Sequence, residues 1–172
     1  MSGNLLTFEM EPLMNFVTIR QYFYKVYNSV MLLLLVAIFS FIVAYLLSTG
    51  DELRESHSPG VRLQFCGIFI TAWLVMFFFL TKKIKSIRNQ QGLRLKLEKY
   101  FQLTIVRYSL IVVISFMLAF ALYTTKDDLF TVLFAVNLVL SIWFWPTSPK
   151  VCRELKLRGD EREMVYFKKD SF

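Results

Sequence analysis

Four long runs of apolar residues without an acidic or basic side chain dominate the pattern along the chain. The runs lie between Lys25 and Asp51 and over residues 63–81, 108–125 and 129–149. Each run reaches or approaches the ~20 residues that a helix needs to cross ~30 Å of hydrocarbon. A membrane barrel would alternate apolar and polar positions over segments of ~10 residues, whereas "VMLLLLVAIFSFIVAYLL" is continuously apolar. The pattern therefore predicts an all-α integral membrane protein with four transmembrane helices, at about 26–49, 63–82, 104–125 and 129–147.

The composition indicates a membrane protein, and the distribution of its basic residues indicates an orientation in the membrane. The apolar share is 56%, above the ~45–50% of soluble domains. Seventeen of the twenty Lys and Arg residues fall before the first span, between the second and third, or after the fourth, and three fall in the other two loops. Because loops rich in Lys and Arg stay in the cytoplasm, an N-in/C-in arrangement is expected. We expect a multi-pass protein of a bacterial cytoplasmic (inner) membrane with both termini cytoplasmic.

The spans divide the chain into three regions. They are a cytoplasmic arm (1–25), a four-helix transmembrane bundle (26–149) and a cytoplasmic tail (150–172). In the arm, the segment "EPLMNFVTIRQYFYKVY" predicts an interfacial helix that leads into the first span, and its second residue, Pro12, suits a first helical turn.

Spans two and three are predicted to extend past the lipid as a cytoplasmic helical hairpin with its turn at Asn89 to Gly92. The alternating leucines of "LRLKL" (93–97) could instead begin a strand, but Arg94 and Glu98 stand at helical spacing, which favours a helix. The loop "KDD", Lys126 to Asp128, makes the last two spans a tight antiparallel hairpin.

Small and polar residues inside the spans indicate helix–helix packing, because small side chains four residues apart let helix backbones approach closely. The expected packing residues are Ser40, Ala44, Gly67, Thr71, Ser115, Ala119, Asn137 and Ser141. Asn137 lies near the middle of the fourth span, where its amide needs a partner in another span or in another copy of the chain. The amide is expected to hold helices together, with a role in a pore or in substrate binding as the alternative.

The segment between spans two and three carries eight basic residues and one acidic residue. Expected contacts with anionic lipid headgroups or a partner protein are Lys82, Lys83, Lys85, Arg88, Arg94, Lys96 and Lys99. Nucleic acid is not an expected partner, because the charges lie next to the membrane and no recognition fold accompanies them.

The tail has the pattern of a short helix, with Ser148 as N-cap, Pro149 at the first helical position and Gly159 as the stop. After it, "MVYF" (164–167) favours a strand, which we predict to pair with Leu5 to Met10 as a short β-ribbon. Residues expected to dock the tail are Val151, Leu155, Val165 and Phe167.

The two cysteines, Cys66 and Cys152, fall on opposite sides of the expected membrane and cannot form a disulfide. Basic neighbours of Cys152 predict a somewhat lowered thiol pKa, and S-acylation at this membrane-proximal position is an alternative to an unmodified thiol.

The sequence contains no motif for catalysis, a cofactor or a metal, so neither an enzyme nor a cofactor is expected. The function that remains is a small structural or regulatory membrane subunit, which acts on a partner protein or on anionic lipid through its basic cytoplasmic surface and its C-terminal tail. The alternative is a homo-oligomeric channel or transporter lined by the fourth span.

Overall fold

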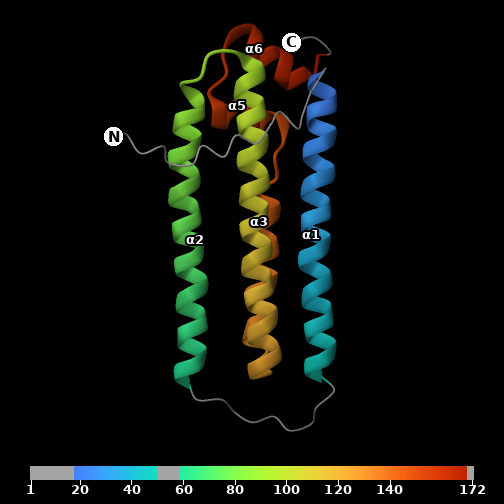
Figure 1. The fold of residues 1–172 in the computed structure, drawn as a ribbon, viewed down its shortest axis with the longest axis vertical. Helices are drawn as coiled ribbons and strands as arrows, with labels where there is room; N and C mark the ends of the chain where they lie inside the picture. The colour runs from blue at the N-terminus through green and yellow to red at the C-terminus, as the bar shows by residue number, and fades with distance from the viewer. Residues whose placement is uncertain (1–17, 50–58, 170–172) are drawn as a thin grey trace, which may run out of the picture.

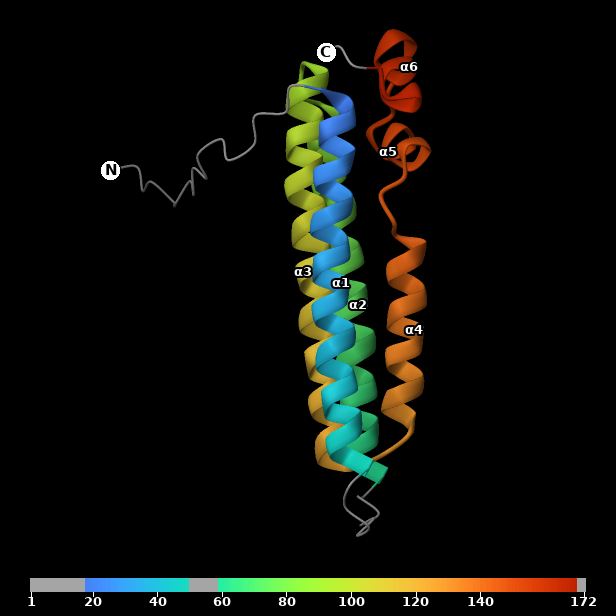
Figure 2. The same cartoon turned by 90° about the vertical axis from the view of Figure 1, so that its right-hand side faces the viewer.

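The computed structural model describes residues 18–49 and 59–169, which contain helices and no strand. The helices are α1 (Ile19–Thr49), α2 (Pro59–Arg88), α3 (Leu93–Thr125), α4 (Leu129–Trp143), α5 (Ser148–Leu155) and α6 (Gly159–Phe167). The first four run up and down along one axis, and α5 and α6 lie across one end (Figures 1 and 2). We call α5 and α6 the cap, and the end of the bundle that carries them the cap end.

Helix α3 is the centre of the bundle. It packs most extensively on α1 and less on α2 and α4. In Figure 1 α1 and α2 flank α3, and Figure 2 shows α4 on one side of these three helices. At the end opposite the cap, an ion pair of 2.6 Å between Arg62 Nε and Asp127 Oδ2 ties the beginning of α2 to the α3–α4 turn.

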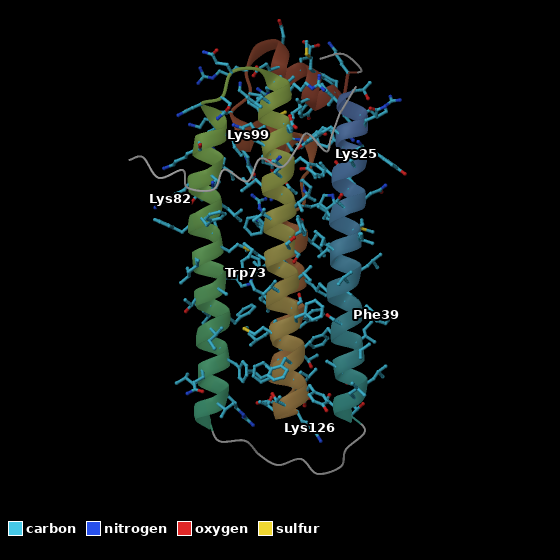
Figure 3. The ribbon with its side chains drawn as sticks, viewed as in Figure 1. Lys25, Phe39, Trp73, Lys82, Lys99 and Lys126 are labelled. Atoms are coloured by element: carbon cyan, nitrogen blue, oxygen red, sulfur yellow. The ribbon has the colours of Figure 1, made fainter. Side chains whose placement is uncertain are left out.

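Helices α1, α2 and α3 are each long and apolar enough to cross a membrane. Helices α4 and α5 would make a fourth span if they are counted together, although the chain bends by 78° between them. The outward faces of the long helices carry large apolar side chains such as Leu32, Phe39 and Leu74, and Figure 3 shows Phe39 pointing away from the bundle. Such faces suit hydrocarbon rather than water. The all-helical class is therefore confirmed, and three helices, or four if α4 and α5 count as one span, are long and apolar enough to cross a membrane.

The two predicted hairpin turns are confirmed. Helix α2 ends at Arg88 and α3 begins at Leu93, so the segment 93–97 is helical and not a strand. Gly92 occupies φ 91°, a backbone conformation that residues with a side chain rarely adopt. The second turn ends α3 with Lys126 in the left-handed region, where its backbone N–H donates to the carbonyl oxygen of Leu122 at 2.8 Å.

The beginning of α1 differs from a separate interfacial helix. Ile19 to Lys25 continue without a break into the rest of α1. Tyr22 and Phe23 are buried there, and the ring of Tyr22 meets Phe101 of α3 edge-on. Packing against α3 therefore holds the beginning of α1 along the bundle axis. Residues 12–17 of the predicted interfacial helix lie outside the described residues.

The predicted strand in the tail is wrong, because Met164 to Phe167 belong to α6. A helix satisfies its own backbone hydrogen bonds, whereas a two-stranded ribbon is marginal without further packing. Gly159 begins α6 at φ 54° instead of ending the preceding helix. The acidic Asp160 and Glu161 fall in the first turn of α6, where their negative charge interacts favourably with the helix dipole. The proposed strand partner, Leu5 to Met10, lies outside the described residues.

Helix α5 also differs in detail from its prediction. Its N-cap residue is Thr147, one position before Ser148, with extended backbone dihedrals. The helix ends at Leu155, because Lys156 adopts a left-handed conformation. The link from α4 is fixed by two stacked ring pairs, Phe144 with Trp73 and Trp145 with Tyr27, at centroid distances of 6.0 Å each.

Candidate functional site

A buried ion pair joins the cap to the bundle. Arg107 of α3 is only 2% exposed, and its Nη2 lies 3.4 Å from Oε2 of Glu154 on α5. Tyr100, seven residues before Arg107 and on the same face of α3, donates its hydroxyl to the same Glu154 oxygen at 2.8 Å. Nε and Nη1 of Arg107 have no hydrogen-bond partner among the described residues, while its guanidinium carbon lies 5.3 Å from the ring centroid of Phe144.

A side chain of helix α2 binds the backbone carbonyl group of the same residue, Glu154. The Nε of Arg88 donates to the carbonyl oxygen of Glu154 at 2.6 Å. Carbonyl groups in the last turn of a helix lack an intrahelical partner, so Arg88 supplies one that α5 itself cannot. Glu154 is thus the point at which α2, α3 and α5 meet.

Apolar side chains of the cap complete the core at this end of the bundle. Val151, Leu155 and Val165 are buried in the same cluster as the first turns of α1 and α3. An ion pair of 2.9 Å between Lys96 of α3 and Glu161 of α6 adds a polar tie. Three of the four residues predicted to dock the tail therefore face the chain's own bundle; the fourth, Phe167, is 67% exposed.

Two cavities beside the cap are lined by basic side chains. The larger, about 1010 Å³, lies between the end of α4, α5 and α6. Its cations are Lys150, Arg153, Lys156, Arg158 and Arg162. The smaller, about 520 Å³, lies between the α2–α3 turn region and α5, and its cations are Lys85, Arg88, Lys96, Lys156 and Arg158. Because Lys156 and Arg158 line both, we treat the two cavities as one feature and call it the basic cleft.

Lys150 lines the larger cavity and is held there by two contacts. Its Nζ donates to the carbonyl oxygen of Trp143 at 2.6 Å and lies 4.8 Å from the ring centroid of Phe144. Burial lowers the pKa of Lys150 below its ordinary value, and the nearby guanidinium groups of Arg107 and Arg153 lower it further, against the opposite effect of Glu154. Lys150 and Glu154 stand four residues apart on α5, yet the ion-pair partner of Glu154 is Arg107 of α3.

The seven basic residues predicted to contact lipid or a partner divide between the basic cleft and positions outside it. Lys85, Arg88 and Lys96 line the basic cleft. Lys82 and Lys83 lie outside it and extend over the rings of Phe78 and Phe79. Arg94 and Lys99 are also outside the cleft. Figure 3 shows Lys82 and Lys99 toward the cap end of the bundle, and Lys126 at the opposite end.

Asn137 links three helices within one chain. The residue is fully buried; its Oδ1 accepts from Nε1 of Trp73 on α2 at 3.2 Å, and its Nδ2 donates to Oγ of Ser115 on α3 at 2.9 Å. Ser141 donates to the backbone carbonyl of Asn137 at 2.7 Å, and Tyr108 donates to that of Ser141 at 3.0 Å. The side chains of Asn137 and Ser141 thus find their hydrogen-bond partners inside the bundle.

The remaining small residues separate into two groups. Ala44 and Ala119 lie in the apolar core away from the cap, and Ser40 donates to the carbonyl oxygen of Ala37 in its own helix. Gly67 and Thr71 face outward and line an open apolar groove between α2 and α3. A Cβ atom at Gly67 would meet nothing within 4 Å, so no helix among the described residues packs against that glycine.

Sequence reasoning missed Arg107 and Glu154 as a pair. Arg107 is one of the eight basic residues assigned to the segment between spans two and three, although it falls within the span predicted at 104–125. A single cation at the start of an otherwise charge-free run was the available signal, since a charge at that depth needs a partner.

The predicted direction of the pKa shift at Cys152 is wrong. Its thiol is buried, which raises its pKa above the ordinary 9.0 despite the opposing charge of Arg162. Its Sγ faces the carbonyl oxygen of Arg162 at 3.8 Å, so the cap covers this thiol instead of presenting it.

Comparison with known protein families, with curated proteins and with solved structures finds no match to this chain.

Proposed function

We propose that this chain is a four-span membrane protein with a cytoplasmic cap end, and that it acts as an accessory or regulatory subunit through its cap and basic cleft. The observation that carries the proposal is the attachment of the cap: Glu154 connects α5 to both α2 and α3. A tail held in this way presents a fixed surface to a partner. Exposed Tyr166 and Phe167 at the end of α6 provide apolar contact area on that surface.

The orientation follows from the charges. Lys and Arg concentrate in the segments at the cap end, and loops of this kind remain cytoplasmic. Helix α4 with the link to α5 supplies the fourth crossing, and the exposed Trp143 near its end suits the headgroup level of a membrane.

A channel formed around α4 is less favoured. Two of its three polar side chains, Asn137 and Ser141, are fully buried and bonded within the chain, and the hydroxyl oxygen of the third, Thr131, is also buried. The outward positions of α4 are apolar, such as Val132, Val139 and Ile142. A pore would need polar groups on that outer face.

Labelling tests the orientation. In a chain whose two native cysteines are replaced by Ser, Gln91→Cys in the α2–α3 turn should resist an impermeant maleimide in intact cells, whereas Lys126→Cys in the α3–α4 turn should react. The reverse pattern would place the cap outside and end the proposal.

Photo-crosslinking tests the role. A photoreactive amino acid at the exposed Phe167 should give a discrete adduct with a second protein in intact cells, and the same group at the outward Phe39 of α1 is the matched control. Adducts only between copies of this chain would support the oligomeric alternative, and equal capture at both positions would contradict a role for the cap.

A further inference from the structure

The larger cavity of the basic cleft is lined by more positive charge than the described residues neutralise. Five cations line the larger cavity, and none of them has an ion-pair partner among the described residues. The cavity's one acidic lining residue, Glu154, already bonds Tyr100 and Arg107 through Oε2. A concave surface with uncompensated charge and aromatic walls concentrates the electrostatic field on whatever enters it.

The floor of the larger cavity lies where α4 ends. Ile142, Trp143, Phe144 and Trp145 line it, and Trp143 is 78% exposed. Aromatic rings of this kind accumulate at the headgroup level of membranes. Behind the floor, the buried Arg107 lies over the ring of Phe144, and its charge is balanced by Glu154, so the net positive charge of the cavity comes from its five lining cations. The opening is thus bounded by lipid-facing aromatic residues on one side and by guanidinium groups on the other.

We infer that the basic cleft binds the phosphate group of an anionic lipid headgroup, with Arg158 and Arg162 as its principal ligands. Arginine is suited to this task because its planar guanidinium donates two parallel hydrogen bonds to a phosphate. Arg158 lines both cavities, and Arg162 projects from α6 into the larger one. The cavity of about 1010 Å³ is large enough for a headgroup, since sites for small ligands span ~300–1,000 Å³. The inference rests on the proposed orientation for access to lipid, and it adds a defined ligand to the proposed function.

The α2–α3 groove, in contrast, would receive the acyl region of lipids without selecting a headgroup, because its lining is apolar apart from Gln64 and Thr71. Headgroup selection therefore has to come from the cleft. A second membrane-facing basic pair, Lys82 and Lys83, provides the comparison, since nonspecific attraction to anionic lipid would act there equally.

The experiment uses the purified full-length protein in a neutral detergent, with phosphatidylglycerol or phosphatidylcholine added and bound lipid counted by native mass spectrometry. We expect tighter binding of phosphatidylglycerol, and a loss of about tenfold or more in Arg158→Gln/Arg162→Gln, because two charge-assisted hydrogen-bonding groups are removed. Arg158→Lys/Arg162→Lys keeps the charge but not the paired donors and should lie in between. Lys82→Gln/Lys83→Gln, which removes the same charge outside the cleft, should change binding by less than about twofold.

Three results would overturn the inference. The first is equal binding of phosphatidylglycerol and phosphatidylcholine. The second is a loss of binding in the Lys82/Lys83 variant as large as that in the Arg158/Arg162 variant. The third is binding of free glycerol phosphate as tight as that of phosphatidylglycerol, which would make the ligand a soluble phosphate ester. Both arginines are exposed, so the variants should unfold at the temperature of the parent protein, and this measurement accompanies each titration. Because binding is measured in detergent, it is independent of the labelling and crosslinking results, and the two proposals can fail separately.

Discussion

Glu154 of α5 approaches the buried Arg107 of α3 to 3.4 Å, although 47 residues separate them in the sequence. A guanidinium that is 2% exposed has lost nearly all its water, and such a charge is tolerated only with a paired anion. The hydroxyl of Tyr100 fixes the same carboxylate oxygen at 2.8 Å and so determines where the pair forms. The cap therefore provides the counter-ion that the buried Arg107 of the bundle needs, as well as apolar contacts.

Removal of the carboxylate should destabilise the protein strongly. Glu154→Gln leaves the charge of Arg107 buried without its counter-ion, and we expect a loss of about 3 kcal/mol in the free energy of unfolding, at the low end for a broken buried pair because Glu154 is partly exposed. Equilibrium unfolding in mixed micelles measures this loss. The exposed pair Lys169–Glu163 gives the control, since Glu163→Gln should cost no more than ~1 kcal/mol.

A double variant separates the pair from other contacts of Glu154. Arg107→Met/Glu154→Gln removes both charges and should recover much of the stability that Glu154→Gln alone loses. If the two substitutions simply add, Arg107 does not depend on Glu154, and the electrostatic account of the cap is wrong.

The second prediction concerns Asn137. Asn137→Leu removes its hydrogen bonds to Trp73 and Ser115, which should cost ~1–2 kcal/mol in unfolding free energy without preventing membrane insertion. Indole fluorescence of Trp73 should change in the same variant, because the ring loses the acceptor of its N–H. Thr124→Val is a suitable control, since that hydroxyl bonds only its own helix backbone and is exposed. Unchanged stability and fluorescence would show that the amide link contributes nothing.

The long apolar helices could be predicted from the sequence because the cost of placing charge in hydrocarbon acts on each residue locally. Charge-free runs thus located α1 to α4, and Gly92 located a turn through its own backbone preference. The tail was harder. A four-residue apolar run such as 164–167 fits a strand or one face of a helix equally well, and its outcome depends on the burial of Val165 in a core formed by distant helices.

The pairing of Arg107 with Glu154 could not be predicted for the same reason. Nothing in the local sequence distinguishes Glu154 from the other acids of the tail, and its local partner at helical spacing was Lys150. Only the bend between α4 and α5 brings Glu154 over α3, and that bend is held by ring contacts of Phe144 and Trp145 with α2 and α1.

Gly92 provides a third prediction, about backbone conformation alone. Its φ of 91° disfavours any side chain, while a Cβ atom there would meet nothing within 4 Å. Gly92→Ala should therefore destabilise by ~1–3 kcal/mol through backbone strain without a steric clash. Gly67→Ala is the matched control, because a Cβ atom there also meets nothing within 4 Å. Since Gly67 lies within helix α2, this change should be neutral or stabilising by up to ~1 kcal/mol. Equal effects of both changes would show that strain at the turn is relieved by movement of the chain.

The fourth prediction uses Cys152 to report whether the cap is closed. Maleimides react with exposed thiolates, and burial both covers this thiol and raises its pKa above the ordinary 9.0. In a Cys66→Ser background at pH 7, we expect Cys152 to react at least roughly tenfold more slowly than Gln91→Cys in a chain without native cysteines, because reaction requires the cap to open locally.

Raised pH should open the cap through the same thiol. Because the pKa is raised in the folded state, the burial of the neutral thiol stabilises the cap fully below the ordinary value of 9.0, and this stabilisation is lost as the pH rises through the folded-state pKa. The rate at Cys152 should therefore rise more steeply with pH in the alkaline range than the rate at Gln91→Cys, which follows thiolate formation alone. Glu154→Gln should speed labelling of Cys152 at pH 7 because it releases α5 from Arg107, whereas Glu163→Gln should leave the rate unchanged. Labelling of Cys152 as fast as that of Gln91→Cys at neutral pH would mean that the cap is already open, and Glu154 would then not hold it.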